Sequence, residues 1–437
     1  MKVSIENFKS IHSVHNFEIK PMTVLSGTNS SGKSSFVQML LLIKKTLDDS
    51  STNSVLSLKN KDFNDVVLNQ NKNNKIVFSI ILDNTEIEIP PNYVNTKEIN
   101  VEVKFQMCDD SILVSDFFLN LKATNSNSWN LKISNDIKRV HKAEVSNPST
   151  FIQDTKKTEF EGSIDFVAMI PQILTDSDGD KYPFKLDWVK DGLTKVFNSL
   201  YYIDPIRQKP EIAYPEKSIS NNYVGIEGEF TAQLLKDFEN EEIDFFMIDH
   251  IERKNTTLLE AVNYWLCEQF NISKKVYSEK KDDSYQIYLE DKNGLKVNIK
   301  HVGYGVSQVL PLIVQGLLMP KGGILIIEQP EIHLHPKIQS LLYDFLYSLT
   351  LLEKKVIVET HSSHFITRMR RRIAEDETNE MDDRINLTFI ENGVFRNLEL
   401  DDYGTILHYY PKDFIEQPAK EMDAIIKAQI KKRRKNG

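Results

Sequence analysis

The stretch Gly27-Thr28-Asn29-Ser30-Ser31-Gly32-Lys33-Ser34 decides the fold of this chain, because it fits the phosphate-binding pattern G-x-x-x-x-G-K-[ST]. The pattern has meaning only between a strand and a helix. Met22 to Leu25 is apolar and predicts a buried strand, and Ser35 to Lys44 predicts an apolar helix. In that setting successive backbone N–H groups converge on a phosphate. The sequence therefore predicts binding of ATP or GTP.

The same stretch indicates which side chains hold each part of the nucleotide. Lys33 is expected to reach the β- and γ-phosphate oxygens, and the Ser34 hydroxyl is placed for Mg²⁺. The expected cofactors are therefore ATP and Mg²⁺. The candidate nucleotide-binding residues of the loop are Asn29, Ser30, Ser31, Gly32, Lys33, Ser34 and Ser35.

A second helix start, far along the chain, predicts a second anion-binding surface. Gly303 to Gln308 leads into an apolar helix expected from Val309 to Leu318. Free N–H groups and the positive end of the helix dipole face outward at such a start. One nucleotide needs only one phosphate cradle. We therefore expect ATP to lie between the P-loop of one subunit and Gly305, Ser307 and Gln308 of another, in a homodimer or a larger assembly.

Two short apolar stretches predict further strands of a parallel sheet. Gly323 to Ile327 runs into Glu328, and Lys355 to Val358 runs into Glu359-Thr360-His361. An acid at the carboxyl end of such a strand suits Mg²⁺, so Glu328 is expected to share the metal with Ser34. A histidine at the end of a strand in the same sheet can contact the γ-phosphate, which makes His361 a candidate catalytic residue.

The motifs resemble those of the ABC-type ATPases of the SMC, RecF and OLD (overcoming-lysogenisation-defect) group when they are taken in chain order. That order is the P-loop, the helix start at Gly303, the strand that ends in an acid and the strand that ends in a histidine. Val3 to Ile11 looks like the first strand and turn of that group. The segment EQPEIHLHP, from Glu328 to Pro336, is similar to the corresponding segment of bacterial OLD-like AAA-type ATPases. Other segments that look like those of one bacterial subgroup are Tyr202–Tyr214, Gly225–Glu229 and Tyr410–Gln417.

The resemblance implies a fold and further roles. The implied fold class is α/β: an ABC-type ATPase head, with a mixed sheet around a P-loop core and an inserted antiparallel sheet and helical arm. Gly305 and Ser307 would contact the partner's γ-phosphate. The Leu334-His335 loop would cross the dimer interface, and His361 would be the switch histidine.

One position departs from the wider ABC pattern. Where most of these ATPases place a catalytic glutamate after the metal-side acid, this chain has Gln329. A carboxamide orients water but cannot accept its proton. Three interpretations remain open: Glu331 is the base, hydrolysis is slow and ATP acts mainly as a dimer clamp, or the glutamine is an engineered replacement. The candidate catalytic residues are Glu328, Gln329, Glu331 and His361.

Length and motif placement predict the domain organisation. The chain has 437 residues, 40% of them hydrophobic, and its nucleotide motifs lie toward the two ends. We expect one ATPase head, formed by residues 1–74 with Walker A and residues 300–400 with Walker B. Residues 75–299 are the expected insertion, and residues 401–437 form a C-terminal extension with a basic tail.

Alternation and periodicity divide the insertion. Residues 75–90 and 100–133 largely alternate apolar and polar side chains and predict antiparallel strands. Residues 230–270 predict helix from three- and four-residue spacings. Residues 277–299 predict a hairpin that turns at Asp291-Lys292-Asn293-Gly294.

Composition bears on location. No apolar run reaches membrane-spanning length, and the N-terminus runs directly into a strand, which predicts no signal peptide and no membrane contact. Cys108 and Cys267 lie far apart, so neither a disulfide framework nor a zinc site is indicated. These features predict a cytoplasmic protein.

Two basic segments are candidate DNA contacts, although the net charge of -9 excludes a uniformly basic surface. One is the predicted helix with Arg368, Arg370, Arg371 and Arg372, and the other is the tail Lys431 to Lys435. Neutralising DNA phosphates would release counterions. The alternative is a solvated helix face and a frayed tail.

Together these features favour an ATPase that dimerises around ATP, hydrolyses it slowly and regulates a separate effector nuclease in bacterial anti-phage defence. The competing interpretation is a DNA-repair or chromosome-maintenance clamp of RecF or SMC type. Residues 362–437 are too few for a Toprim nuclease and lack a D-x-D pair, so no nuclease activity is expected in this chain. A transporter subunit is disfavoured because Gly-Val-Ser-Gln replaces SGGQ at Gly305 to Gln308.

Overall fold

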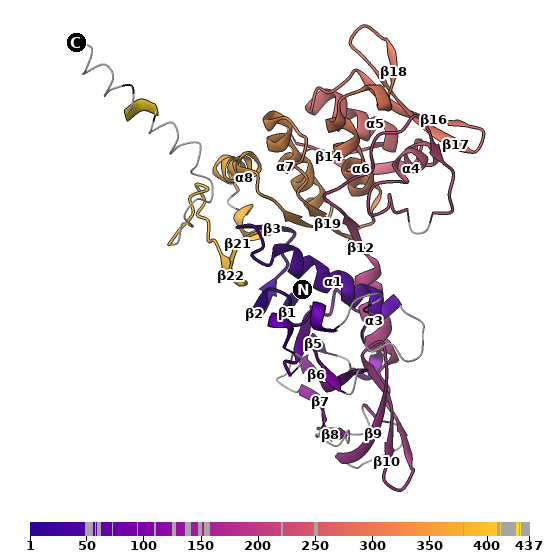
Figure 1. Cartoon of the computed structure of the whole chain (residues 1–437), viewed down its shortest axis with the longest axis vertical. Helices are drawn as coiled ribbons and strands as arrows, with labels where there is room; N and C mark the ends of the chain where they lie inside the picture. The colour runs from indigo at the N-terminus through magenta and orange to yellow at the C-terminus, as the bar shows by residue number, and fades with distance from the viewer. Residues whose placement is uncertain are drawn as a thin grey trace.

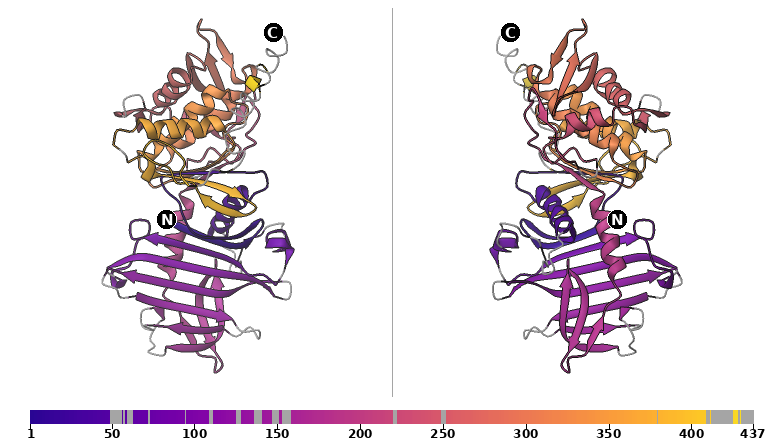
Figure 2. Two further views of the ribbon diagram at one scale, coloured as in Figure 1. Left: turned by 90° about the vertical axis from the view of Figure 1, so that its left-hand side faces the viewer. Right: turned by 90° about the vertical axis from the view of Figure 1, so that its right-hand side faces the viewer.

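The computed structural model describes residues 1–48, 56, 58, 63–71, 73–93, 95–108, 111–124, 128–135, 141–146, 151–152, 158–219, 222–248, 252–378, 380–408, 411, 425–427 and 429. Its layers are built on the two larger of its sheets, one antiparallel and one mixed, and helices pack on both faces of the mixed sheet. A large antiparallel sheet lies at one end of the molecule, a group of helices at the other, and a mixed sheet between them (Figures 1 and 2).

The mixed sheet carries the nucleotide motifs. Its order is β12-β19-β20-β3-β21-β22, and every pair is parallel except β21 with β22. The strands are β3 (Met22–Gly27), β12 (Leu200–Ile203), β19 (Ile324–Glu328), β20 (Lys355–Glu359), β21 (Ile385–Glu391) and β22 (Val394–Asn397). The expected strands around the P-loop, Glu328 and Glu359 are confirmed, and they occupy the buried centre, where parallel strands need apolar residues on both faces.

Helices cover both faces of this sheet. They are α1 (Lys33–Asp48), α3 (Asp187–Asn198), α4 (Thr231–Asp237), α5 (Leu258–Asn263), α6 (Tyr304–Leu318), α7 (Pro336–Thr350) and α8 (Ser363–Glu375). On β19, Ile324 and Ile326 join a core with α1, α3 and the antiparallel sheet. Leu325 and Ile327 point the other way, into the core of α4 to α8. Strand β19 therefore contributes side chains to both hydrophobic cores.

The antiparallel sheet has ten strands in the order β11-β10-β9-β8-β7-β6-β5-β4-β1-β2. They are β1 (Lys2–Phe8), β2 (Ile11–Glu18), β4 (Ile76–Asp83), β5 (Thr96–Cys108), β6 (Ser111–Ala123), β7 (Ser128–Asn135), β8 (His141–Val145), β9 (Glu159–Val167), β10 (Ile170–Asp176) and β11 (Lys181–Pro183). The expected antiparallel region is confirmed and is larger than the alternation indicated. The fold class is therefore α/β, with a P-loop core in a mixed sheet and a second, antiparallel sheet.

The sheets do not follow the expected division at residues 74 and 75. β1 pairs with β4, so the first strands of the chain belong to the antiparallel sheet. In the other direction, β12 lies inside the expected insertion, yet it pairs in parallel with β19 of the mixed sheet. Pairing between distant segments decides both cases, and local sequence patterns carry no information about it.

The prediction of continuous helix over residues 230–270 is wrong in its middle. There, β14 (Glu242–Met247) and β15 (Glu252–Thr257) form a two-stranded antiparallel sheet. Thr257 then caps α5, because its side chain accepts from the Glu260 N–H while the Glu260 side chain reaches back. A short π-helix, Tyr264–Gln269, completes the segment.

The predicted hairpin over residues 277–299 has three strands and not two. They are β16 (Lys275–Lys281), β17 (Ser284–Glu290) and β18 (Lys296–Asn298), joined at one edge by β13 (Tyr214–Pro215). The turn expected at residues 291–294 joins β17 to β18, while the turn at residues 282–283 was not predicted. The remaining elements are 3-10 helices at Phe63–Asp65, Leu68–Gln70, Pro91–Tyr93, Ile299–His301 and Asp382–Arg384.

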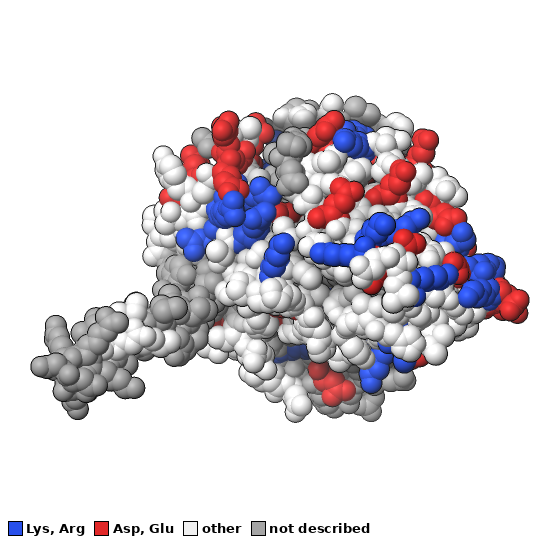
Figure 3. Space-filling view, turned by 90° about the horizontal axis from the view of Figure 1, so that it is seen from above, with Lys and Arg blue, Asp and Glu red and all other residues white. Residues whose placement is uncertain are grey.

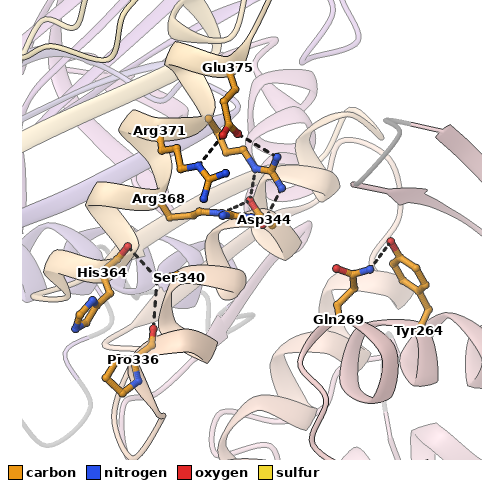
Figure 4. A network of polar contacts seen from close by, with 10 residues as sticks. Tyr264, Gln269, Pro336, Ser340, Asp344, His364, Arg368, Arg371 and Glu375 are labelled. Carbon is orange, nitrogen blue, oxygen red and sulfur yellow. Dashed lines mark hydrogen bonds and ion pairs between the residues drawn. The ribbon is translucent and has the colours of Figure 1, made fainter.

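A buried carboxylate joins α7 to α8 (Figure 4). The Asp344 side chain is 1% exposed and accepts hydrogen bonds from Arg368 Nε at 3.0 Å and from Arg372 Nε at 2.8 Å. Glu375 pairs with Arg371 nearby, but both of these side chains are far more exposed, at 40% and 63%. Glu375 also pairs with Arg372 at 3.4 Å, so each carboxylate binds two arginines and the two sites differ mainly in solvent access.

We expect Asp344→Asn to lower the free energy of unfolding by about 3–5 kcal/mol, because it leaves two guanidinium groups without their buried anion. The matched variant Glu375→Gln removes a surface partner and should cost about 1 kcal/mol or less. Urea denaturation of both variants measures the difference. Equal losses would show that Asp344 does not anchor α8.

Candidate nucleotide-binding site

The P-loop leaves β3 through a glycine that the neighbouring strand requires. Gly27 has a φ of +147°, and a Cβ there would lie 2.0 Å from the carbonyl oxygen of Ile390 on β21. Gly32, at the end of the loop, has a φ of +115°. Only glycine combines such backbone angles with such close approach. These two glycines therefore let the backbone pass from β3 into α1 where a side chain would be strained or would clash.

A pocket of about 360 Å³ lies against this loop. Every loop residue expected to bind nucleotide lines it, and so do Gln329 and His361 from the ends of β19 and β20. The lining residues are Lys9, Ser10, Asn29, Ser30, Ser31, Gly32, Lys33, Ser34, Ser35, Gln329, Glu359 and His361. Lys9, Ser10 and Glu359 were not predicted from the sequence as site residues.

Polar groups of the loop fit a phosphate. The Ser31 side chain is 3% exposed, and its hydroxyl has no hydrogen-bond partner within the described part of the chain. Among the residues that the structure describes, Lys33 Nζ donates to two loop carbonyls, those of Gly27 at 3.2 Å and Thr28 at 2.7 Å. Burial lowers the pKa of Lys33, and the nearby Glu359 opposes this shift. A phosphate would supply the acceptor that Ser31 lacks and a stronger partner for Lys33.

Two buried glutamates end adjacent strands beside Ser34. Glu328 and Glu359 are direct partners in the parallel register of β19 and β20, and they are 7% and 3% exposed. The Ser34 hydroxyl donates to Glu359, at 2.9 Å and 3.1 Å to its two carboxylate oxygens. Burial, followed by the charge of Glu328, raises the pKa of Glu359 to about 7. Burial also raises the pKa of Glu328.

Glu328 has its own hydrogen-bond partner on β12. The Tyr202 hydroxyl donates to it at 2.9 Å, and the Tyr223 hydroxyl donates to the Tyr202 carbonyl. Next to Tyr223, the Val224 N–H donates to Gln315 Oε1 of α6 at 2.8 Å. The helix that carries Ser307 is therefore connected to Glu328 through hydrogen bonds and one short stretch of backbone.

Arg207 lies behind the two strand ends. It is 3% exposed, and its Nη2 donates to the Glu328 carbonyl at 3.3 Å. Its Nε and Nη1 have no hydrogen-bond partner among the described residues. Burial lowers the pKa of Arg207 to about 10, while Glu331 and Asp204 raise it. Arg207 thus supplies positive charge next to an acidic strand end.

Gln329 and Glu331, the two candidates for the position of the base, differ in where they lie. Gln329 lines the pocket, has a φ of +44°, and donates its backbone N–H to the Glu359 carbonyl at 2.7 Å. Glu331 accepts from the Thr360 hydroxyl at 2.9 Å and from the His361 N–H at 2.7 Å, and it does not line the pocket. Gln329 therefore lies at the pocket, whereas the carboxylate of Glu331 binds the backbone of His361.

His361 extends into the pocket from the end of β20. It is only partly exposed and lines the pocket together with Lys33. Burial of the ring, and then the charge of Lys33, lower the pKa of His361. A neutral imidazole at this position can both donate and accept hydrogen bonds, which suits contact with a phosphate.

Gly305, Ser307 and Gln308 lie outside this pocket. Contrary to the expected loop, they belong to the first turns of α6, which begins at Tyr304 after Gly303 as N-cap. Ser307 donates its hydroxyl to the Tyr304 carbonyl at 2.8 Å and is 7% exposed. The Tyr304 and His333 rings lie 5.6 Å apart. The start of α6 and the loop before α7 thus form a surface separate from the P-loop.

The candidate DNA-binding arginines are largely engaged within the protein. Arg368 and Arg372 bind Asp344, and Arg370 Nε donates to the Gly404 carbonyl at 2.7 Å. Arg371 remains exposed but pairs with Glu375. Figure 3 shows basic side chains interspersed with acidic ones on the face formed by the helical end. The tail Lys431–Lys435 lies outside the described residues, as does nearly all of Tyr410–Gln417.

A comparison with protein-family models finds a match that spans most of the chain. A family model described as an AAA ATPase domain (AAA_15) matches residues 1–366, from the first strand to beyond His361. No curated protein is similar enough in sequence to count as a relative. In the described part of the chain, no helix has both the length and the apolar character needed to cross a membrane. The family match spans every residue that lines the pocket.

The solved structures that are similar to this chain include three SMC head domains. The SMC head domain from Thermotoga maritima shares 11% identity over 92% of this chain and 98% of that chain, with a TM-score of 0.38. The SmcHead bound to the C-winged helix domain of ScpA shares 11% identity over 92% and 97%, with a TM-score of 0.42. The Smc head domain with an extended coiled coil, bound to the C-terminal domain of ScpA derived from Pyrococcus furiosus, shares 10% identity over 97% and 98%, with a TM-score of 0.43.

We expect Tyr202→Phe to lower the free energy of unfolding by about 1–3 kcal/mol, because it removes a hydrogen bond to a buried carboxylate. Tyr201→Phe is the matched control on the same strand: the Tyr201 side chain is 7% exposed, and the described residues offer its hydroxyl no partner. Urea denaturation without nucleotide or metal gives both values. Indistinguishable losses would contradict the role assigned to the Tyr202 hydroxyl.

Proposed function

The chain belongs to the AAA ATPase domain family, and we propose that it binds ATP with Mg²⁺ at the P-loop and uses ATP to join two subunits. The observation that carries this proposal is the pocket itself. It brings together Lys33, Gln329, His361 and the buried Ser31 hydroxyl, for which the described residues offer no hydrogen-bond partner. Ser34 and Glu328 would hold the metal, which neutralises phosphate charge when bound.

Dimerisation is supported by the separation of the two phosphate-binding surfaces. Gly305 and Ser307 lie at the start of α6 and do not line the P-loop pocket. Tyr304, in the same turn, is 42% exposed although it is a large aromatic side chain. A second copy of the chain would bring this helix start to the γ-phosphate and cover Tyr304. The positive end of the helix dipole suits such a contact.

Slow hydrolysis is supported by the position of Gln329. It faces the pocket, whereas the carboxylate of Glu331 is bound to Thr360 and to the backbone of His361. Gln329 can orient a water molecule but cannot take its proton. ATP would therefore persist in the dimer long enough to act as a clamp.

The output we propose is control of a separate effector nuclease in bacterial anti-phage defence. Its support is the resemblance of the Glu328 to Pro336 segment to OLD-like ATPases. Direct DNA binding, as by a RecF- or SMC-type clamp, is the alternative. The arginines of α8 favour it less than the sequence indicated, because Asp344 already binds Arg368 and Arg372.

We expect Ser307→Arg to leave ATP binding nearly intact and to abolish ATP-dependent association, because a bulky cation would occupy the proposed contact with the partner's nucleotide. Since Ser307 is 7% exposed, Tyr304→Glu at the more exposed position serves as a second variant. Lys33→Ala should abolish ATP binding itself. Calorimetry measures binding, and sedimentation velocity with and without ATP measures assembly. An unchanged ATP-dependent assembly in both interface variants would refute the composite site.

Gln329→Glu should raise the rate of hydrolysis, because it places a general base beside the pocket, an effect on the order of 10²- to 10⁴-fold when well positioned. Single-turnover phosphate release measures it. Glu331→Gln is the companion variant and should retain hydrolysis, whereas Glu328→Gln should not. Loss of hydrolysis in Glu331→Gln, with no gain in Gln329→Glu, would identify Glu331 as the base.

A further inference from the structure

The pocket is lined by a carboxylate to which the sequence motifs assign no role, that of Glu359. We propose that Glu359 is a second carboxylate ligand of the nucleotide-bound divalent cation, which it shares with Glu328 and Ser34. This inference rests on the proposed function and specifies the metal ligands of the same site.

The position of Ser34 carries the inference. Its hydroxyl, the group of the P-loop that faces the metal, donates to both carboxylate oxygens of Glu359 at 2.9 Å and 3.1 Å. Glu328 lies beside Glu359 in the strand register, and its own hydrogen bond comes from Tyr202. A cation bound to the Ser34 hydroxyl oxygen would therefore lie close to the carboxylate of Glu359. The sequence predicted only Glu328 as a carboxylate ligand of the metal, and the structure places Glu359 beside it.

Charge at the strand ends also calls for a cation. The buried or half-buried acids that influence one another there are Glu328, Glu359, Glu331 and Asp204, and the nearby cations are Lys33 and Arg207. Glu359 also lines the pocket where phosphates would lie. Buried like charges repel strongly unless a counter-charge lies between them. A divalent cation between the carboxylates and the phosphates supplies that charge.

The ligand set predicts that the metal needs the nucleotide. No group of three or more His, Cys, Asp or Glu side chains in the described residues is arranged to hold a metal ion. The protein offers two carboxylates and the Ser34 hydroxyl, while Mg²⁺ prefers six oxygen ligands. Ser31 lines the same pocket and is 3% exposed, and its hydroxyl has no hydrogen-bond partner in the described part of the chain, which independently indicates a phosphate ligand. Phosphate oxygens and water would complete the coordination.

The test measures Mn²⁺ binding to the full chain in the presence of ADP, from the electron paramagnetic resonance signal of free Mn²⁺. Glu359→Gln should weaken Mn²⁺ binding about 10- to 100-fold, and Glu328→Gln should do the same. Glu359→Asp keeps the charge and should recover part of the affinity. Glu391→Gln, at the end of β21 in the same sheet, is the matched control and should bind Mn²⁺ like wild type.

Metal-free ADP binding separates the assignment of Glu359 as a metal ligand from the proposed function, nucleotide binding at the P-loop. In Glu359→Gln it should be unchanged or tighter, because a negative charge near the phosphates is gone; this outcome, with weakened Mn²⁺ binding, supports the proposal. Wild-type Mn²⁺ affinity in Glu359→Gln, with loss in Glu328→Gln, would overturn it and leave the proposed function standing. If wild-type protein binds no ADP, the proposed function fails and the metal assignment fails with it. Circular dichroism confirms that each variant is folded.

Discussion

The parallel register of β19, β20 and β3 is the constraint on which the site depends. It aligns Glu328 with Glu359 and Glu359 with Leu25 of the strand that enters the P-loop. Because parallel strands end at the same edge, the acids, the histidine and the phosphate loop meet there without any side chain having to span the sheet. A shift of either strand by one residue would turn a glutamate into the apolar core of the opposite face.

The sequence predicted the features of this site that depend on local pattern. The P-loop, the apolar strands and their terminal acids each follow from a few consecutive residues, and the rule for parallel strand ends placed them together. Glu359 was not predicted as a site residue, and Tyr202 was not predicted to donate a hydrogen bond to Glu328. Both features depend on which strands lie side by side. β12, which carries Tyr202, joins the sheet from a segment far from every nucleotide motif.

Charge patterns gave the least reliable predictions for the same reason. Four arginines on α8 indicate a basic surface until Asp344, on a different helix, is seen to bind two of them.

The middle of the predicted helix over residues 230–270 had a local signal that was overlooked. Thr257 followed by Glu260 is a capping box, which marks the start of a new helix and so argues against a continuous one.

The turn between β1 and β2 supplies Lys9 and Ser10 to the pocket wall, and the Ser10 hydroxyl lies 2.9 Å from that of Ser35 on α1. β1 in turn is held between β2 and β4. The antiparallel sheet is therefore not an appendage that could be excised to leave a minimal ATPase. Deleting residues 76–183 would remove β4, a neighbour of β1, and would expose apolar side chains of α1 that share a core with the antiparallel sheet. The turn that carries Lys9 and Ser10 would then no longer be held at the pocket wall.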